Sequence, residues 1–165
     1  MMGHRPFQRA AAVIACLAFL PALLAVWAAS AQPAGQPTVE PPEIGEIMIF
    51  QQLRHAKLWF AGKAGNWPLA DYQVKELREG FETVSKYYPT FNDIPVATMI
   101  DAIRDTNFPE LDKAVAAHDR AKFARAFDRL TQACNACHQS SELGFIVIRR
   151  PTTPPFSNQS FEPKK

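Results

Sequence analysis

Residues 119–138 read DRAKFARAFDRLTQACNACH, a segment in which apolar side chains recur at helical spacing. Steps of four, three, four and four residues separate Phe123, Phe127, Leu130, Cys134 and His138, which places them on one face of an α-helix. Asp119 is suited to capping the first turn of this helix, and Gly144 is suited to ending it. The segment therefore predicts an amphipathic helix with a thiol and an imidazole on its apolar face.

Three stretches upstream have the same helical spacing of apolar residues. They cover residues 44–61, 69–88 and 94–106. Pro109 is predicted to break the third helix and to leave a short helical piece before the last one. No segment of this region alternates in the manner of a β-hairpin, so the helices have to bury their apolar faces against one another. We therefore expect an all-α fold, an antiparallel four-helix bundle over residues 44–144.

The two ends of the chain differ from this body. Residues 1–31 combine basic residues, an apolar run and the ending Ala-Ser-Ala, which is typical of a cleaved signal peptide and predicts export to the periplasm. An uncleaved membrane anchor is the alternative, because the apolar run is close to spanning length. Residues 32–43 predict a flexible, Pro-rich lead-in. Residues 145–165 predict an extended, Pro-rich C-terminal tail, either disordered or anchored to the bundle through Phe156 and Phe161.

The charge composition argues against some classes of partner. The 165 residues include 18 Lys and Arg against 16 Asp and Glu, a formal net charge of +2. This balance gives no grounds for a nucleic-acid partner or an acidic substrate. No Ser-His-Asp arrangement, Gly-rich phosphate loop or carboxylate cluster stands out, so we do not expect an enzyme.

The segment Cys134-Asn-Ala-Cys137-His138 has the C-x-x-C-H spacing of covalent haem attachment. Two thiols can add to the two vinyl groups of the porphyrin, and the adjacent imidazole can bind the iron as proximal ligand. On a helix Cys134 and His138 share one face with Cys137 beside them, so all three reach one flat macrocycle. A thiol redox motif, a zinc site and a pair of inert thiols are the alternatives, but the chain has no βαβ pattern and no further ligands at a recognisable spacing. The motif predicts one covalently bound haem c.

An exported four-helix bundle with C-x-x-C-H near the end of its last helix resembles the class II c-type cytochromes, the cytochrome c prime family, over residues 44–139. The resemblance implies Cys134 and Cys137 as the thioether attachments and His138 as the proximal ligand. It also implies that the residue facing the iron from the other side comes from the first helix and is apolar or a methionine. The chain departs from the family at residues 139–143, where the family usually has an aromatic-basic pair.

Two residues of the first predicted helix are candidates for the distal ligand. Met48 lies near the helix start, which an antiparallel bundle places beside the end of the last helix, and a thioether ligand raises the reduction potential. Ordinary core packing is the alternative for this side chain. His55 follows two turns later on the same face and is suited to ligating iron, to bonding a haem propionate, or to a place in the core.

Together these features predict a periplasmic monohaem c-type cytochrome that carries single electrons between redox partner proteins. The alternative is a haem protein with an open distal position that binds nitric oxide or carbon monoxide. Three aromatic residues supply either core packing or a homodimer interface, namely Trp59, Phe60 and Trp67. Five basic residues are candidate partners of the haem propionates, namely Arg54, Lys57, Lys63, Arg149 and Arg150.

Overall fold

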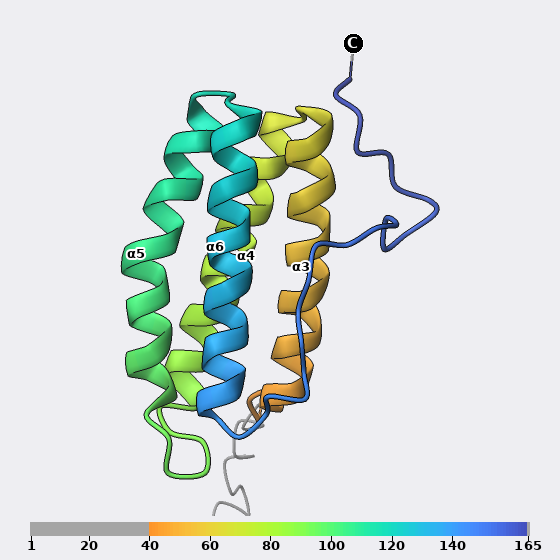
Figure 1. The fold of residues 1–165 in the computed structure, drawn as a ribbon. Helices are drawn as coiled ribbons and strands as arrows, with labels where there is room; N and C mark the ends of the chain where they lie inside the picture. The colour runs from red at the N-terminus through yellow and green to blue at the C-terminus, as the bar shows by residue number, and fades with distance from the viewer. Residues whose placement is uncertain (1–39, 165) are drawn as a thin grey trace, which may run out of the picture. The chain divides into compact units, whose positions relative to one another are not determined.

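Four antiparallel helices form a bundle in the computed structural model, which describes residues 40–164 (Figure 1). The helices are α3 (Ile44–Ala64), α4 (Trp67–Tyr87), α5 (Val96–Ala116) and α6 (Arg120–Ser140). Each helix packs on the next along the chain, and α6 packs on α3, so the four surround one core. No β-strand occurs among the described residues, and the prediction of an all-α four-helix bundle is confirmed. The predicted signal peptide and nearly all of the predicted lead-in lie outside the described residues.

The core is built from the predicted apolar faces. Leu58 of α3, Val84 of α4, Leu111 of α5 and Leu130 of α6 have no exposed surface. Burying side chains of this size stabilises the folded chain by roughly 1.5–3 kcal/mol each. The shared core, rather than helix propensity, therefore holds the four helices together.

No helix in residues 40–164 is long and apolar enough to cross a membrane.

Gly62 allows α3 to approach α6. A Cβ atom at this position would lie 2.1 Å from the ring of Phe123, which is closer than non-bonded atoms can come. The sequence predicts a helix end near this glycine, but α3 continues to Ala64. Gly65 ends the helix instead, in the left-handed conformation with a φ of 78°. Gly62 is therefore a packing residue whose missing side chain leaves room for Phe123.

The predicted break at Pro109 is wrong, because α5 continues through this residue. Pro109 is exposed, whereas its neighbours Phe108 and Leu111 are buried in the core. Proline removes the hydrogen bond to the carbonyl group four residues earlier, at a cost of about 3 kcal/mol. That carbonyl belongs to Asp105, an exposed residue where water can replace the lost bond. Burial of the two apolar neighbours outweighs the loss, so the helix persists.

α6 begins where the sequence predicts and ends before Gly144. Asp119 caps its first turn as predicted, since its carboxylate accepts a backbone N–H. After the helix the chain turns at Glu142, which has a φ of 62°, a conformation more usual for glycine. The Leu143 N–H donates to the His138 carbonyl at 2.8 Å, which closes the turn. The turn directly follows the C-x-x-C-H motif and sends the chain back along α6.

Residues 145–164, which we call the C-terminal strap, lie along α3 and α6 toward the opposite end of the bundle (Figure 1). Arg150 forms a two-point ion pair with Asp128 of α6, at 2.7 and 2.6 Å, and its guanidinium lies 4.4 Å from the ring centre of Trp59 of α3. Farther along, Phe161 is buried against α3. The strap has no helix or strand of its own, and it is fixed to both neighbouring helices by side-chain contacts.

Three aromatic residues left open by the sequence pack inside the chain. Phe60 is buried, Trp59 packs on Phe127 with 5.0 Å between ring centroids, and Trp67 stacks on His118 at 5.4 Å. These contacts assign the three side chains to intramolecular packing. A homodimer remains a prediction.

Candidate functional site

A cavity of about 260 Å³ lies at the end of the bundle where α3 begins and α6 ends. The five residues singled out from the sequence all line this cavity, namely Met48, His55, Cys134, Cys137 and His138. Most of the remaining wall is apolar and includes Leu77, Phe81, Val96, Ile100, Ile103 and Ile148. The fold therefore gathers the predicted site residues around one apolar space.

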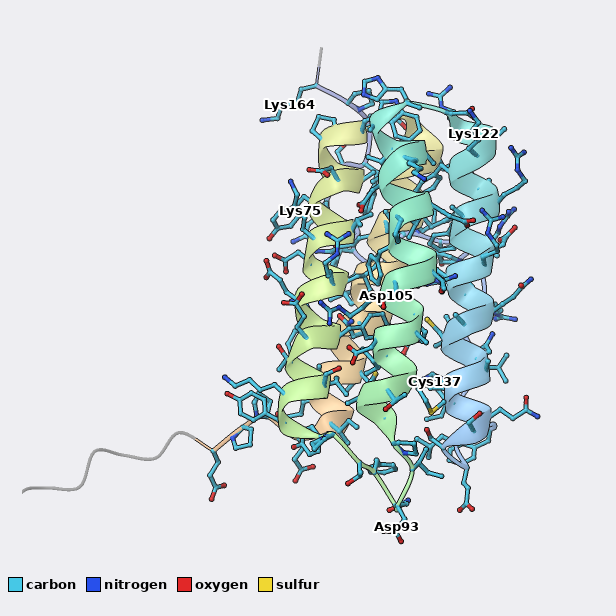
Figure 2. The ribbon with its side chains drawn as sticks, turned by 90° about the vertical axis from the view of Figure 1, so that its left-hand side faces the viewer. Lys75, Asp93, Asp105, Lys122, Cys137 and Lys164 are labelled. Atoms are coloured by element: carbon cyan, nitrogen blue, oxygen red, sulfur yellow. The ribbon has the colours of Figure 1, made fainter. Side chains whose placement is uncertain are left out.

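Cys134 and Cys137 reach the cavity from the last turns of α6. Figure 2 shows Cys137 in the lower half of this helix, on the side that faces the rest of the bundle. Both cysteines are free thiols. Burial raises the pKa of Cys134 to about 12, with a further contribution from the neighbouring Cys137, and burial also raises the pKa of Cys137, which a hydrogen bond with Ser141 partly offsets. Both thiols stay protonated at neutral pH, which does not suit thiol–disulfide exchange, a reaction of the thiolate.

His138 presents one ring nitrogen as an available electron-pair donor. Its Nδ1 atom lies 2.9 Å from the backbone carbonyl oxygen of Ile146 in the strap. A carbonyl oxygen only accepts hydrogen bonds, so Nδ1 carries the proton and donates it. In the neutral ring the lone pair is then on Nε2, the atom through which such a histidine binds iron.

His55 is buried, and its hydrogen bond fixes the opposite tautomer. Its Nε2 atom lies 2.8 Å from Oγ1 of Thr131, while the Thr131 hydroxyl donates to the Phe127 carbonyl at 2.9 Å. Since the hydroxyl proton is engaged, the threonine oxygen accepts from the Nε2–H of His55. Burial lowers the pKa of His55 to about 4, so the ring is neutral at physiological pH. Ligation through Nε2 would break this buried bond.

Met48 is the second distal candidate on α3. Its side chain is half-buried in the first turns of the helix and lines the same cavity as His138. A thioether sulfur has no proton and needs no hydrogen bond to be satisfied. Met48 can therefore bind iron without losing a hydrogen bond, whereas His55 would have to give up its bond to Thr131 or bind through Nδ1 from a ring which that bond holds in place.

A second hollow of about 450 Å³ adjoins the cavity and gives it a polar edge. The two spaces share Gln52, His55 and Ile148, and Arg149 lines the second one. Of the other basic candidates, Arg54 pairs with Glu76 at 3.0 Å and Arg150 pairs with Asp128, while Lys57 and Lys63 line neither space. Arg149 is exposed and forms no ion pair with the residues that the structure describes. Among the predicted propionate partners, Arg149 has the most suitable place.

Sequence reasoning missed the part that the strap plays at this site. Ile146 and Ile148 line the cavity, and Asn135, inside the motif, binds the backbone of Ile148. The available signal is the β-like run at residues 145–148, which has no partner strand in the sequence. The backbone of this run forms its hydrogen bonds with side chains of α6, and the spacing of apolar residues gives no sign of such bonds.

The residues around the cavity fit a covalently attached haem. Two thiols on one helix, an imidazole with a free Nε2 and an apolar wall are the groups that such a haem requires from a protein. Within residues 40–164 no group of three or more His, Cys, Asp or Glu side chains is arranged to hold a bare metal ion. No protein-family model matches this chain, and comparison with curated proteins and with solved structures finds no significant match.

Proposed function

We propose that this protein is a periplasmic c-type cytochrome that carries one electron at a time between redox partner proteins. Cys134 and Cys137 would hold one haem c, with His138 as the proximal ligand and Met48 as the distal ligand. The observation that supports this function best is the single cavity that these four residues share, with His138 bonded to the strap through Nδ1, which leaves Nε2 for a ligand.

Each thiol would be joined to the haem by addition. The sulfur atoms of Cys134 and Cys137 would hold the group as thioethers, each formed by adding S–H across a vinyl group, so no atom would be lost and no oxidant would be needed. Once bound, the haem supplies the one-electron chemistry, as its iron alternates between the ferric and ferrous states. The two cysteines would hold the group against α6, where His138 lies one residue from Cys137.

The protein's own residues orient the group and adjust its reduction potential. The apolar wall offers water few hydrogen-bond partners, and a surrounding of low polarity would disfavour the additional positive charge of ferric iron. Neutral His55 adds no charge to the wall. Arg149, at the polar edge, is suited to binding a propionate group by charge-assisted hydrogen bonds.

The optical spectrum of the reduced protein, recorded before and after addition of carbon monoxide, tests the proposal. The chain is made with its leader in cells that have a cytochrome c maturation system. We expect a haem band from the wild-type protein that carbon monoxide leaves unchanged, because Met48 fills the sixth position. Met48→Ala should bind carbon monoxide promptly and become high-spin. Met99→Ala, at a half-buried methionine of α5 outside the cavity wall, is the matched control and should behave as wild type.

Two results would contradict this function. Wild-type protein without any haem band would remove the cytochrome itself. A prompt carbon monoxide shift in the wild-type protein would show an open sixth position and favour the binding of gaseous ligands over electron transfer. If His55→Ala opens the iron to carbon monoxide and Met48→Ala does not, the distal assignment is wrong.

A further inference from the structure

The beginning of the C-terminal strap passes directly over the C-x-x-C-H motif. After the turn at Glu142, the Ile146 N–H donates to the Leu143 carbonyl at 2.8 Å, which fixes where the strap starts. The next contact is the Ile146 carbonyl, which accepts the Nδ1–H of His138. The acceptor is a backbone atom, so its position depends on how the strap is held.

Asn135 holds the strap from inside the motif. Its Nδ2 donates to the Ile148 carbonyl at 2.9 Å, and its Oδ1 accepts the Ile148 N–H at 2.7 Å. One side-chain amide thus pairs with both backbone groups of a single residue, as a neighbouring β-strand would. This pairing needs a donor and an acceptor attached to the same carbon, as in an amide, and neither aspartate nor alanine has them.

Three alternate residues of the strap bind three residues of α6. Ile146 binds His138, Ile148 binds Asn135, and Arg150 binds Asp128, in that order along the antiparallel segments. The first two contacts use backbone groups of the strap and the third uses the Arg150 side chain, so together they fix the position of residues 146–150 along α6. A change at Asn135 or Asp128 therefore acts on the Ile146 carbonyl through the strap.

We propose that the first part of the strap, residues 145–150, is the positioning element of the proximal ligand, and that Asn135 is its positioning residue. This inference rests on the proposed function, because it concerns the same iron ligand. The Ile146 carbonyl keeps the proton on Nδ1, fixes the plane of the His138 ring and directs Nε2 to the cavity. An acceptor on Nδ1–H also makes Nε2 a stronger electron donor, which favours ferric iron.

Asn135→Ala tests the inference in the matured, full-length protein. Without the amide the strap loses its register over His138, so we expect the midpoint reduction potential to become more positive. We also expect the Nδ1 proton of His138, followed by NMR in the reduced protein, to exchange with water roughly tenfold faster, the factor that one net hydrogen bond represents. Gln132→Ala is the matched control, since Gln132 is an exposed amide three residues earlier on the same helix. A purely structural role for Asn135 would lower the stability without moving the potential.

Asp128→Asn is a second variant that should change the position of the Ile146 carbonyl. This variant keeps the shape of the side chain and removes the charge that holds Arg150, so the potential and the exchange rate should shift in the same directions by smaller amounts. This variant replaces Asn135→Ala as the test if Asn135→Ala yields no folded protein.

The outcomes separate this inference from the proposed function. Covalent haem in every variant, with potentials and exchange rates equal to those of Gln132→Ala, would overturn the positioning role and leave the cytochrome intact. Wild-type protein that takes up no haem would overturn both. A changed potential in Asn135→Ala together with an unchanged Nδ1 exchange rate would also overturn it, because the effect would then not pass through Ile146.

Discussion

At the scale of single residues, His55 makes the stability of the fold depend on pH. Its pKa is about 4 in the folded chain and 6.5 in the unfolded chain, because burial disfavours the charged ring. Between these values the unfolded chain binds a proton that the folded chain does not. Stability is therefore lost as the pH falls through this window, and is fully present above pH 6.5.

His55→Gln tests this contribution, because glutamine does not titrate and can still bond to Thr131. Between pH 7 and pH 4 the free energy of unfolding of the wild-type protein should fall by about 3 kcal/mol more than that of the variant. Urea denaturation at the two pH values measures both falls. His118→Gln, at an exposed histidine, is the control and should titrate like the wild type. If the free energy of unfolding of the wild-type protein and of His55→Gln fell by the same amount between pH 7 and pH 4, His55 would not be neutral and buried.

The sequence predicts single residues well where chemistry demands a fixed spacing. Cys134, Cys137 and His138 were predicted as site residues from their C-x-x-C-H spacing, and the structure brings all three to one cavity. The role of Asn135 could not be predicted in the same way. Its partner is the backbone of Ile148, thirteen residues away, and the two meet only because the chain turns at a glutamate in a glycine-like conformation.

At the scale of secondary-structure elements, α5 contains a proline, Pro109, whose replacement should stabilise the helix. Pro109 lies on the exposed side, and its ring replaces an N–H that would bond to the Asp105 carbonyl. Pro109→Ala should restore this bond and raise the free energy of unfolding by about 1–3 kcal/mol, since proline costs about 3 kcal/mol inside a helix and recovers part of it by restricting the unfolded chain.

Thermal and urea denaturation measure the effect of Pro109→Ala. Ala102→Ser on the exposed side of the same helix is a suitable control, with an expected change below about 0.5 kcal/mol. A destabilised Pro109→Ala variant would mean that the proline has a packing role which the structure does not show.

Helix type was predictable for all four elements, while the helix ends were predictable only in part. Periodic apolar residues mark the buried faces of α3, α4 and α6, and Asp119 marks a start by its capping side chain. The continuity of α5 was not predictable. The low helix propensity of Pro109 opposes a helix at this point, but the burial of Phe108 and Leu111 in the core stabilises the helical conformation more strongly. Tertiary packing of this kind has no local signal.

At the scale of the whole molecule, the strap and the bundle share one core. Phe161 is 8% exposed and packs on Phe60, so the last part of the chain contributes to the same apolar interior as the helices. Phe156, also in the strap, is 40% exposed and contacts the ammonium group of Lys57 at 5.0 Å. The strap therefore contains one buried and one half-exposed phenylalanine, and substitutions at the two positions can be compared directly.

Phe161→Ala should lower the free energy of unfolding by about 3 kcal/mol, and Phe156→Ala by about 1 kcal/mol or less. Urea denaturation followed by circular dichroism of the helices measures both changes. Because this signal comes from the bundle, it responds to Phe161 only if the strap unfolds together with the helices. Equal and small effects of the two substitutions would show a strap that detaches independently.

The course of the strap also decides how the molecule would respond to mechanical force. The strap starts beside His138 and ends at the opposite end of the bundle (Figure 1). Tension applied at the C-terminus at right angles to the bundle axis therefore acts on the strap contacts one after another, on Phe161 first, then on Arg150, and on the Ile146 carbonyl last. Contacts that are loaded singly resist less than contacts loaded in parallel. Pulling the chain from this end and in this direction would therefore peel the strap away step by step and separate the imidazole of His138 from its acceptor last.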